Sequence, residues 1–223
     1  MAEKEVITKS VSYPCLKDYE ETYRNFNWEH IKKDFSSFFS AGRVNIAFDA
    51  IDRHAAGSRK DKVALYWKGA HGQTQKYTFL DMKMYSDKVA VVLQGLGVKK
   101  GDRVFVFLPR IPELYISIIA IAKLGAVAGP MFSAFGPEAV RDRLKDSEAK
   151  ALITTTELKK RIDEVRNELP HLEHILIVGA KGHLTKGEIS YEAVMQDAAK
   201  GFEIEWVDAE APLYMLYTSG TTG

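Results

Sequence analysis

The stretch RVFVFLPRIPELYISIIAIAKLGAVAGPMF, residues 103–132, decides the fold class. It begins with the apolar run RVFVFLP (103–109), which is typical of a buried strand. Pro112 then marks the first turn of a helix that runs to Leu124, and AVAGPMF (126–132) has the composition of a second strand. Because parallel neighbours need a helical crossover of this length, the stretch predicts an α/β unit.

The same alternation extends to both sides of this stretch. Upstream, two strand-like runs flank Gly69 and Gly72, which predicts a hairpin, and Thr78 lies three residues before Asp81, which predicts a helix cap. Downstream, Pro137 opens another helix. The expected strands are 62–67, 76–79, 103–109, 126–132, 151–155, 174–179 and 213–217, the expected helices end near 96, 124, 144, 169 and 199, and a surface loop is expected at 179–190. We therefore predict an α/β fold, a mainly parallel sheet with helices on both faces.

Residues 1–60 have a different pattern and are expected to form a helical arm packed on the main body. Three aromatic residues recur at the spacing of one helix face: Tyr19, Tyr23 and Phe26. Asp52 and its neighbour Arg53 are expected to form a local ion pair. We therefore divide the chain into an N-terminal helical arm, 1–60, and an incomplete α/β domain, 61–223.

Charge and composition exclude several classes of partner. Lys and Arg number 31 against 30 Asp and Glu, which gives no basis for binding nucleic acid or an anionic membrane surface. The most membrane-like run, 114–129, is interrupted by Lys123, whereas a membrane span needs about 20 apolar residues. Cys15 is the only cysteine and no secretory signal is recognisable, so we expect a cytoplasmic protein. No metal site is expected, because His171 and His174 have no cysteine or carboxylate cluster to complete one.

The end of the chain carries the clearest sign of function. LYMLY (213–217) is followed by TSGTTG (218–223), a loop of hydroxyl residues and glycines after an expected strand. Small residues let backbone N–H groups converge on an anion, and ligands bind at the carboxyl ends of strands in open α/β sheets. The loop is not of the P-loop type, because Gly220 and Gly223 are only three residues apart and no lysine follows within the chain. Spacing alone favours phosphate binding and leaves an ordinary turn as the alternative.

Several stretches resemble one enzyme family. YTSGTTG (217–223) resembles the start of the phosphate-loop motif of the adenylate-forming, AMP-producing acyl-CoA synthetases, which continues through a proline and a lysine followed by glycine. YEETYRNFNW (19–28), NIAFDAIDRH (45–54) and the long segment 99–154 resemble the acetyl-CoA synthetase branch of that family. The resemblance implies that the chain is the N-terminal portion of such an enzyme.

The resemblance also implies a reaction. Enzymes of this branch join acetate to CoA in two steps, with ATP and Mg²⁺: an acetyl-adenylate and diphosphate form first, and then acetyl-CoA and AMP. The residues implied to hold the ATP phosphates are Thr218, Ser219, Gly220, Thr221, Thr222 and Gly223. The family places no nucleophile in this loop, so no catalytic residue is expected within the chain.

A second implied site concerns CoA. Phe132, Ser133 and Ala134 align with a stretch where the family commonly has a glycine pair after the phenylalanine, and where backbone lines the pantetheine channel. Ser133 and Ala134 occupy the glycine places, which would narrow that channel. Lys160 and Arg161 match, at shifted spacing, two family arginines for the CoA nucleotide phosphates; the alternative is a solvated helix face.

The remaining family motifs and the small C-terminal domain would follow Gly223. We therefore expect the 223-residue chain alone to be inactive and its main partner, besides carboxylate, ATP and CoA, to be the missing C-terminal part of the same enzyme. Three alternatives stay open: a medium-chain or aryl acyl-CoA synthetase, a noncatalytic α/β nucleotide-binding module, and an inert product of a truncated gene.

Overall fold

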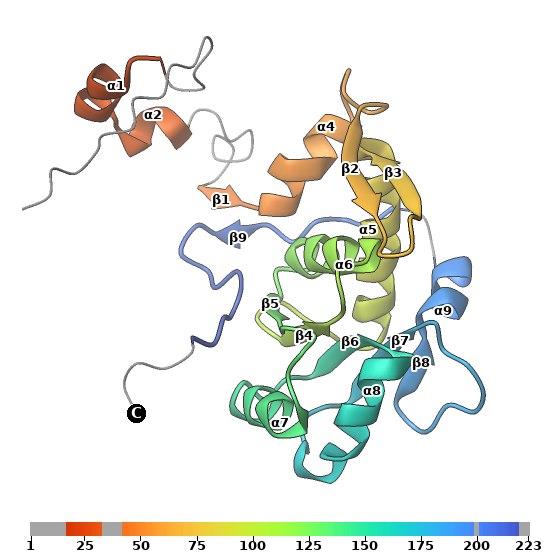
Figure 1. Ribbon diagram of the computed structural model, residues 1–223. Coiled ribbons are helices and arrows are strands. Elements are labelled where there is room, and N and C mark those ends of the chain that lie inside the picture. Colours follow the sequence, from red (N-terminus) through yellow and green to blue (C-terminus); the bar gives the residue numbers. More distant parts are fainter. Residues whose placement is uncertain (1–16, 33–41, 199–200, 219–223) are drawn as a thin grey trace, which may run out of the picture.

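A five-stranded parallel sheet forms the centre of the computed structural model, which describes residues 17–32, 42–198 and 201–218 (Figure 1). The order of its strands is β5-β4-β6-β7-β8, and every neighbouring pair is parallel. Their bounds are β4 (Arg103–Phe107), β5 (Val127–Pro130), β6 (Ala151–Thr155), β7 (His174–Val178) and β8 (Glu188–Ser190). The predicted α/β class is confirmed.

Helices cover both faces of this sheet. Successive side chains of a strand point to opposite faces, and here both faces carry apolar side chains that the helices bury. In β4, Val104 and Val106 belong to one core, whereas Phe105 and Phe107 belong to the other. The first core is closed by α5 (Phe79–Gly95) and α6 (Pro112–Lys123), and the second by α7 (Pro137–Asp146) and α8 (Thr156–Asp163). Both faces are covered, as the sequence predicts.

Local signals set the helix starts. Thr78 accepts a hydrogen bond from the backbone N–H of Asp81, and the Asp81 carboxylate accepts one from the N–H of Thr78, so α5 begins with the predicted capping box. α8 is shorter than predicted and ends at Asp163, before a 3₁₀ turn η2 (Arg166–Glu168). The predicted hairpin is present as the antiparallel pair β2 (Val63–Lys68) and β3 (Thr74–Thr78).

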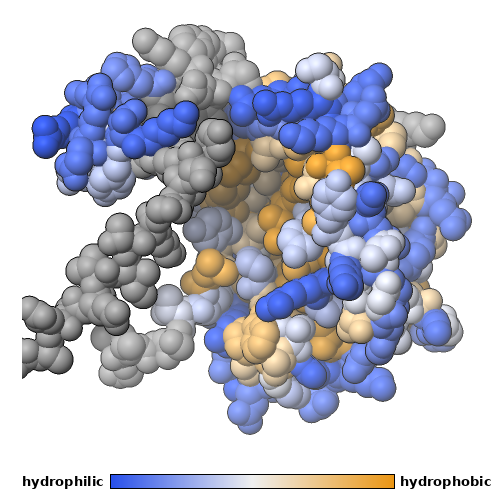
Figure 2. Space-filling model, turned by 45° about the horizontal axis from the view of Figure 1, so that its top comes forward, coloured by the Kyte–Doolittle hydropathy of each residue, from blue (hydrophilic) through white to orange (hydrophobic). Residues whose placement is uncertain are grey.

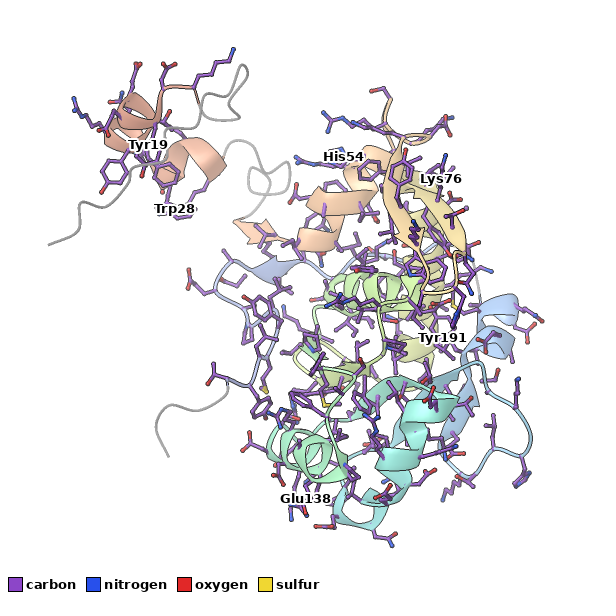
Figure 3. All side chains as sticks on the ribbon, in the orientation of Figure 1. Tyr19, Trp28, His54, Lys76, Glu138 and Tyr191 are labelled. Carbon is purple, nitrogen blue, oxygen red and sulfur yellow. The ribbon has the colours of Figure 1, made fainter. Side chains whose placement is uncertain are left out.

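The N-terminal helices lie apart from the sheet (Figure 1). α1 (Tyr19–Asn25) contains no buried residue, and Tyr19 and Trp28 stay largely exposed on α1 and α2 (Trp28–Lys32) (Figure 3). The expectation that residues 1–60 pack on the body is therefore wrong for α1, whereas Trp28 of α2 lines a groove together with Val44 and Val207. In contrast, the π-helix η1 (Phe48–Asp52) and α4 (Arg53–Ala55) carry buried residues, and Ile51 joins the core beside α5 and α6.

Three short pairings differ from the sequence-based expectation. β8 lies within the expected loop 179–190, and β1 (Arg43–Val44) pairs antiparallel with β9 (Val207–Asp208). The expected strand 213–217 is wrong in extent, since only Tyr214 forms a bridge, parallel to Ala128 of β5. The next ladder bond would need a backbone N–H from Pro130, which proline lacks, so the ladder ends there.

Four charged side chains join η1, α5 and α6 in a ring of ion pairs, in which each lysine contacts both aspartates. We call them the buried cluster. Its members are Asp52, Lys83, Asp87 and Lys123. The ammonium group of Lys123, fully buried, lies 2.8 Å from Asp52 Oδ1 and 2.5 Å from Asp87 Oδ1. The expected Asp52–Arg53 pair is wrong: Arg53 contacts Asp49 at 3.6 Å, and Asp52 contacts the two lysines. Burial raises the pKa of the Asp52 carboxyl, although Lys123 and Lys83 lower it.

Candidate functional site

Two of the predicted site segments follow the carboxyl ends of β5 and β6, the two strands that flank β4 in the sheet. Residues 132–134 begin one residue after the end of β5, and α8, which carries Lys160 and Arg161, follows β6. The segment 213–217 runs parallel to β5, so it leads toward the same edge of the sheet. Ligands of open parallel sheets bind at this edge.

The phosphate loop itself is described only at its first residue. Thr218 is exposed. Ser219, Gly220, Thr221, Thr222 and Gly223 lie outside the described residues. Their role in holding ATP phosphates stays a prediction.

The chain that leads into this loop is fixed at several points. The N–H of Glu205 donates to the carbonyl of Lys123 at 2.9 Å, and β9 then pairs with β1. Gly125 lets this segment approach α6, because it has a φ of +63° and a Cβ there would lie 2.8 Å from Cγ1 of Val207. Farther on, the N–H of Met215 donates to the carbonyl of Ala128 at 2.8 Å. The approach to the loop is therefore held up to two residues before Tyr217.

Tyr217, the residue before Thr218, is held by the last turn of α7. Its hydroxyl donates to Asp146 Oδ2 at 2.6 Å and lies 3.3 Å from the carbonyl oxygen of Arg143. Burial, together with the negative charge of Asp146, raises the pKa of Tyr217 to about 12. The guanidinium carbon of Arg143 lies 5.5 Å from the centre of the Tyr217 ring and 4.2 Å from that of Phe135. We call Phe135, Arg143, Asp146 and Tyr217 the α7 cluster.

The predicted CoA residues fall into two groups. Phe132 is 63% exposed and meets Phe135 edge-on, with ring centres 5.8 Å apart; Ser133 and Ala134 form the turn between them. Arg161 Nη1 donates to the carbonyl oxygens of Ser133, at 2.7 Å, and Phe135, at 2.8 Å. The interpretation of a solvated helix face is therefore wrong for Arg161, which braces the turn, whereas Lys160 is exposed.

Sequence reasoning missed Arg143 and Asp146. They lie three residues apart on an amphipathic helix, and their contacts with Tyr217 span 74 and 71 residues of sequence. No local pattern marks such a contact. The one usable signal is the tyrosine that precedes TSGTTG, because a large aromatic residue there needs a packing partner.

Large hydrophobic side chains are exposed in the turn after β5 and along the segment 213–217. They include Phe132, Leu213, Tyr214 and Leu216. A groove of about 640 Å³ lies beside β1 and β9 and is lined by apolar residues such as Ile46, Ala126 and Val207. Hydrophobic atoms also reach the surface in a recessed part of the face shown in Figure 2.

Two features are absent from the described ranges 17–32, 42–198 and 201–218. No three His, Cys, Asp or Glu side chains lie together so that they could hold a metal ion. No helix there has the length and apolarity that a membrane crossing requires.

Comparison with known proteins gives one consistent family. The pattern of the family described as AMP-binding enzyme matches residues 51–223. The acetyl-coenzyme A synthetase of Bacillus subtilis is 47% identical over 209 residues, which cover 93% of this chain and 36% of that protein. The acetyl-coenzyme A synthetase of Rubrobacter xylanophilus is 34% identical over 234 residues, again covering 36% of that protein. These relatives confirm the resemblance to the acetyl-CoA synthetase branch.

Solved structures agree with these relatives. An acyl-CoA synthetase of Brucella canis superimposes with a TM-score of 0.83 at 26% identity and covers 93% of this chain and 37% of its own. An anthranilate CoA ligase in complex with anthranoyl-AMP superimposes with a TM-score of 0.73 at 29% identity. The match covers 81% of this chain and 33% of the ligase chain. The chain thus spans about a third of the length of the proteins it matches.

Proposed function

Because the chain belongs to the family of AMP-binding enzymes, we propose that the protein to which it contributes is an acid–thiol ligase acting on acetate. The carboxylate oxygen attacks the α-phosphorus of ATP, and diphosphate leaves. The CoA thiolate then attacks the carbonyl carbon of the acetyl-adenylate, and AMP leaves. The two steps together convert ATP, acetate and CoA into acetyl-CoA, AMP and diphosphate.

The observation that carries this proposal is the fixed segment that leads into the hydroxyl and glycine motif 218–223. The motif begins at Thr218, directly after a segment that β5 and α7 hold in place. An anionic nucleophile must approach a highly charged triphosphate, and donors aimed at the phosphate oxygens reduce that repulsion. In this proposal Thr218, Ser219, Thr221 and Thr222 supply hydroxyls, and Gly220 and Gly223 allow close approach of the backbone.

Mg²⁺ would enter with ATP. No described side chains form a cluster that fits a metal ion, so we assign no residue of this chain to it. The ion's contribution is neutralisation of phosphate charge. CoA is proposed to pass the turn at 132–134, braced by Arg161.

Acetate is proposed as the acid because the relative at 47% identity is an acetyl-coenzyme A synthetase. The anthranilate ligase at 29% identity makes an aromatic acid the alternative. Since the chain spans about a third of the length of these relatives, we also propose that the 223-residue chain alone does not form an adenylate.

The test is AMP release by the full-length protein that contains this chain, with acetate, propionate, butyrate and benzoate offered separately. We expect acetate to give the highest kcat/KM. Thr221→Ala should lower kcat/KM for ATP on the order of 10²-fold, as loss of one donor to a developing charge does elsewhere. Thr22→Ala, on the exposed surface of α1, is the matched control and should change nothing.

The outcomes separate the alternatives. Equal rates with all four acids would remove the acetate preference, and a preference for benzoate would favour an aryl ligase. No AMP release from any acid would favour a noncatalytic nucleotide-binding module. Diphosphate formation by the 223-residue chain, above its Thr221→Ala variant, would contradict the proposed inactivity of the chain alone.

A further inference from the structure

The last described contacts before the phosphate loop come from one side chain. The N–H of Met215 is the last backbone group of the segment bonded to β5. Of the two residues between Met215 and Thr218, Tyr217 contacts the body of the protein through its hydroxyl and its ring, whereas Leu216 is 58% exposed. The position of Thr218 therefore depends on Tyr217.

The hydroxyl contact is strong for its partly exposed position. A 2.6 Å bond from a phenol to a carboxylate is charge-assisted and directional. Asp146 is on the last turn of α7, and Tyr217 also packs against the core beneath α7 and α8. The phenol is thus held both by its polar end and by its ring.

Arg143 extends this contact to a second loop. Its guanidinium lies against the rings of both Phe135 and Tyr217, and Nη1 is fixed by a 2.7 Å bond to the carbonyl of Ala139. Phe135 closes the turn that contains Ser133, which Arg161 holds from α8. One arginine therefore contacts the segment before the phosphate loop and the turn after β5.

From these contacts we propose that Tyr217 is a positioning residue for the ATP loop, anchored by Asp146 and Arg143 of α7. The inference rests on the proposed function and adds a residue to it. Tyr217 touches no reacting atom; it sets where Thr218 begins, and so where the donors that follow can meet the phosphates. Through Arg143 the same anchor links the start of the loop to the turn at 132–135.

The first arm of the test uses the 223-residue chain and needs no activity. Hydrogen exchange of the Met215 amide, measured by NMR or by mass spectrometry of peptides that contain it, reports how often the segment leaves β5. Tyr217→Phe and Asp146→Ala should each accelerate this exchange about fivefold, the loss expected for one net hydrogen bond. Tyr214→Phe is the matched control, because Tyr214 is 59% exposed, and it should leave the rate unchanged.

The second arm uses the full-length protein and separates positioning from mere stability. Tyr217→Phe should raise KM for ATP about fivefold while kcat and KM for acetate change less than twofold. Asp146→Ala should do the same, and the double variant should be no worse than either single one, because both remove the same hydrogen bond. A purely structural role would lower kcat through loss of active protein and leave KM for ATP unchanged.

The exchange rate tests the anchor, and KM for ATP tests the positioning role. Unchanged exchange in Tyr217→Phe overturns the anchor. Faster exchange with an unchanged KM for ATP overturns the positioning role and leaves a structural contact. If the full-length wild type releases no AMP, the proposed function fails and the ATP role of Tyr217 fails with it, whereas the exchange result still decides whether the anchor exists.

Discussion

Two clusters of side chains, the buried cluster and the α7 cluster, hold distant parts of the chain against the central sheet, and they differ in their access to water. The buried cluster joins η1 to α5 and α6, and its Lys123, Asp87 and Asp52 are each 5% exposed or less. The α7 cluster joins the approach to the phosphate loop to the opposite face of the sheet, and Tyr217 and Asp146 there remain accessible to solvent.

Burial decides what each cluster does when a partner is lost. Inside the protein, no water replaces the missing partner, so a remaining charge is left unsolvated. At the surface, water replaces most of a lost hydrogen bond or ion pair. The buried cluster is therefore suited to fix the position of η1, whereas the α7 cluster can open at low free-energy cost, as the proposed ATP-binding loop would require.

The largest expected effect comes from Lys123→Met in the buried cluster. The substitution leaves two buried carboxylates, Asp52 and Asp87, with Lys83 as their remaining cation. The free energy of unfolding should fall by about 3–5 kcal/mol, the range for removing one partner of a buried pair. Urea denaturation followed by far-UV circular dichroism measures it.

Lys100→Met is the control for this substitution. Lys100 Nζ lies 3.4 Å from Glu205 Oε1, and both side chains are 47% exposed, so the loss should stay below about 1 kcal/mol. If Lys123→Met and Lys100→Met destabilise the chain equally, burial does not distinguish the two kinds of cluster.

A smaller effect is expected on α8, where two neighbouring cations have different surroundings. Arg161→Ala removes the bonds to the carbonyls of Ser133 and Phe135 and should lower the free energy of unfolding by about 1–2 kcal/mol. Lys160→Ala, at an exposed position, should stay within about 0.5 kcal/mol. The same urea titration compares them, and equal losses would mean that the turn at 132–135 does not depend on Arg161.

The sheet was predictable from sequence because its signals are local. The apolar run 103–109 and the helix from Pro112 occur where the pattern places them. The short pairs were not predictable, since β1 and β9 have two residues each and β8 has three. The segment 213–217 was predicted as a strand because its own composition is typical of one. Its pairing stops early because of Pro130, which belongs to the neighbouring strand β5.

The candidate site likewise has one part that could be predicted from sequence and one part that could not. The loop motif 218–223 is contiguous and could be recognised, whereas the groups that hold Tyr217, the residue before it, come from a helix more than seventy residues away. Lys123 illustrates the same limit in the core, where a lysine that interrupts an apolar run pairs with Asp52 and Asp87. Contacts between distant segments depend on the fold, and no local pattern encodes them.

The smallest expected effect is a pH dependence of the α7 cluster. The pKa of Tyr217 is raised from 10 to about 12 in the folded chain, so the folded state binds this proton more tightly than the unfolded state. Its contribution to stability is therefore complete below pH 10 and is lost as the pH rises toward 12. Because Tyr217 is partly exposed, solvent screening should limit the change to less than about 1 kcal/mol.

The difference in unfolding free energy between wild type and Tyr217→Phe should thus shrink between pH 9 and pH 11, since every other tyrosine is common to both proteins. A difference that stays constant over this range would mean that the phenol–carboxylate bond does not distinguish the folded from the unfolded chain.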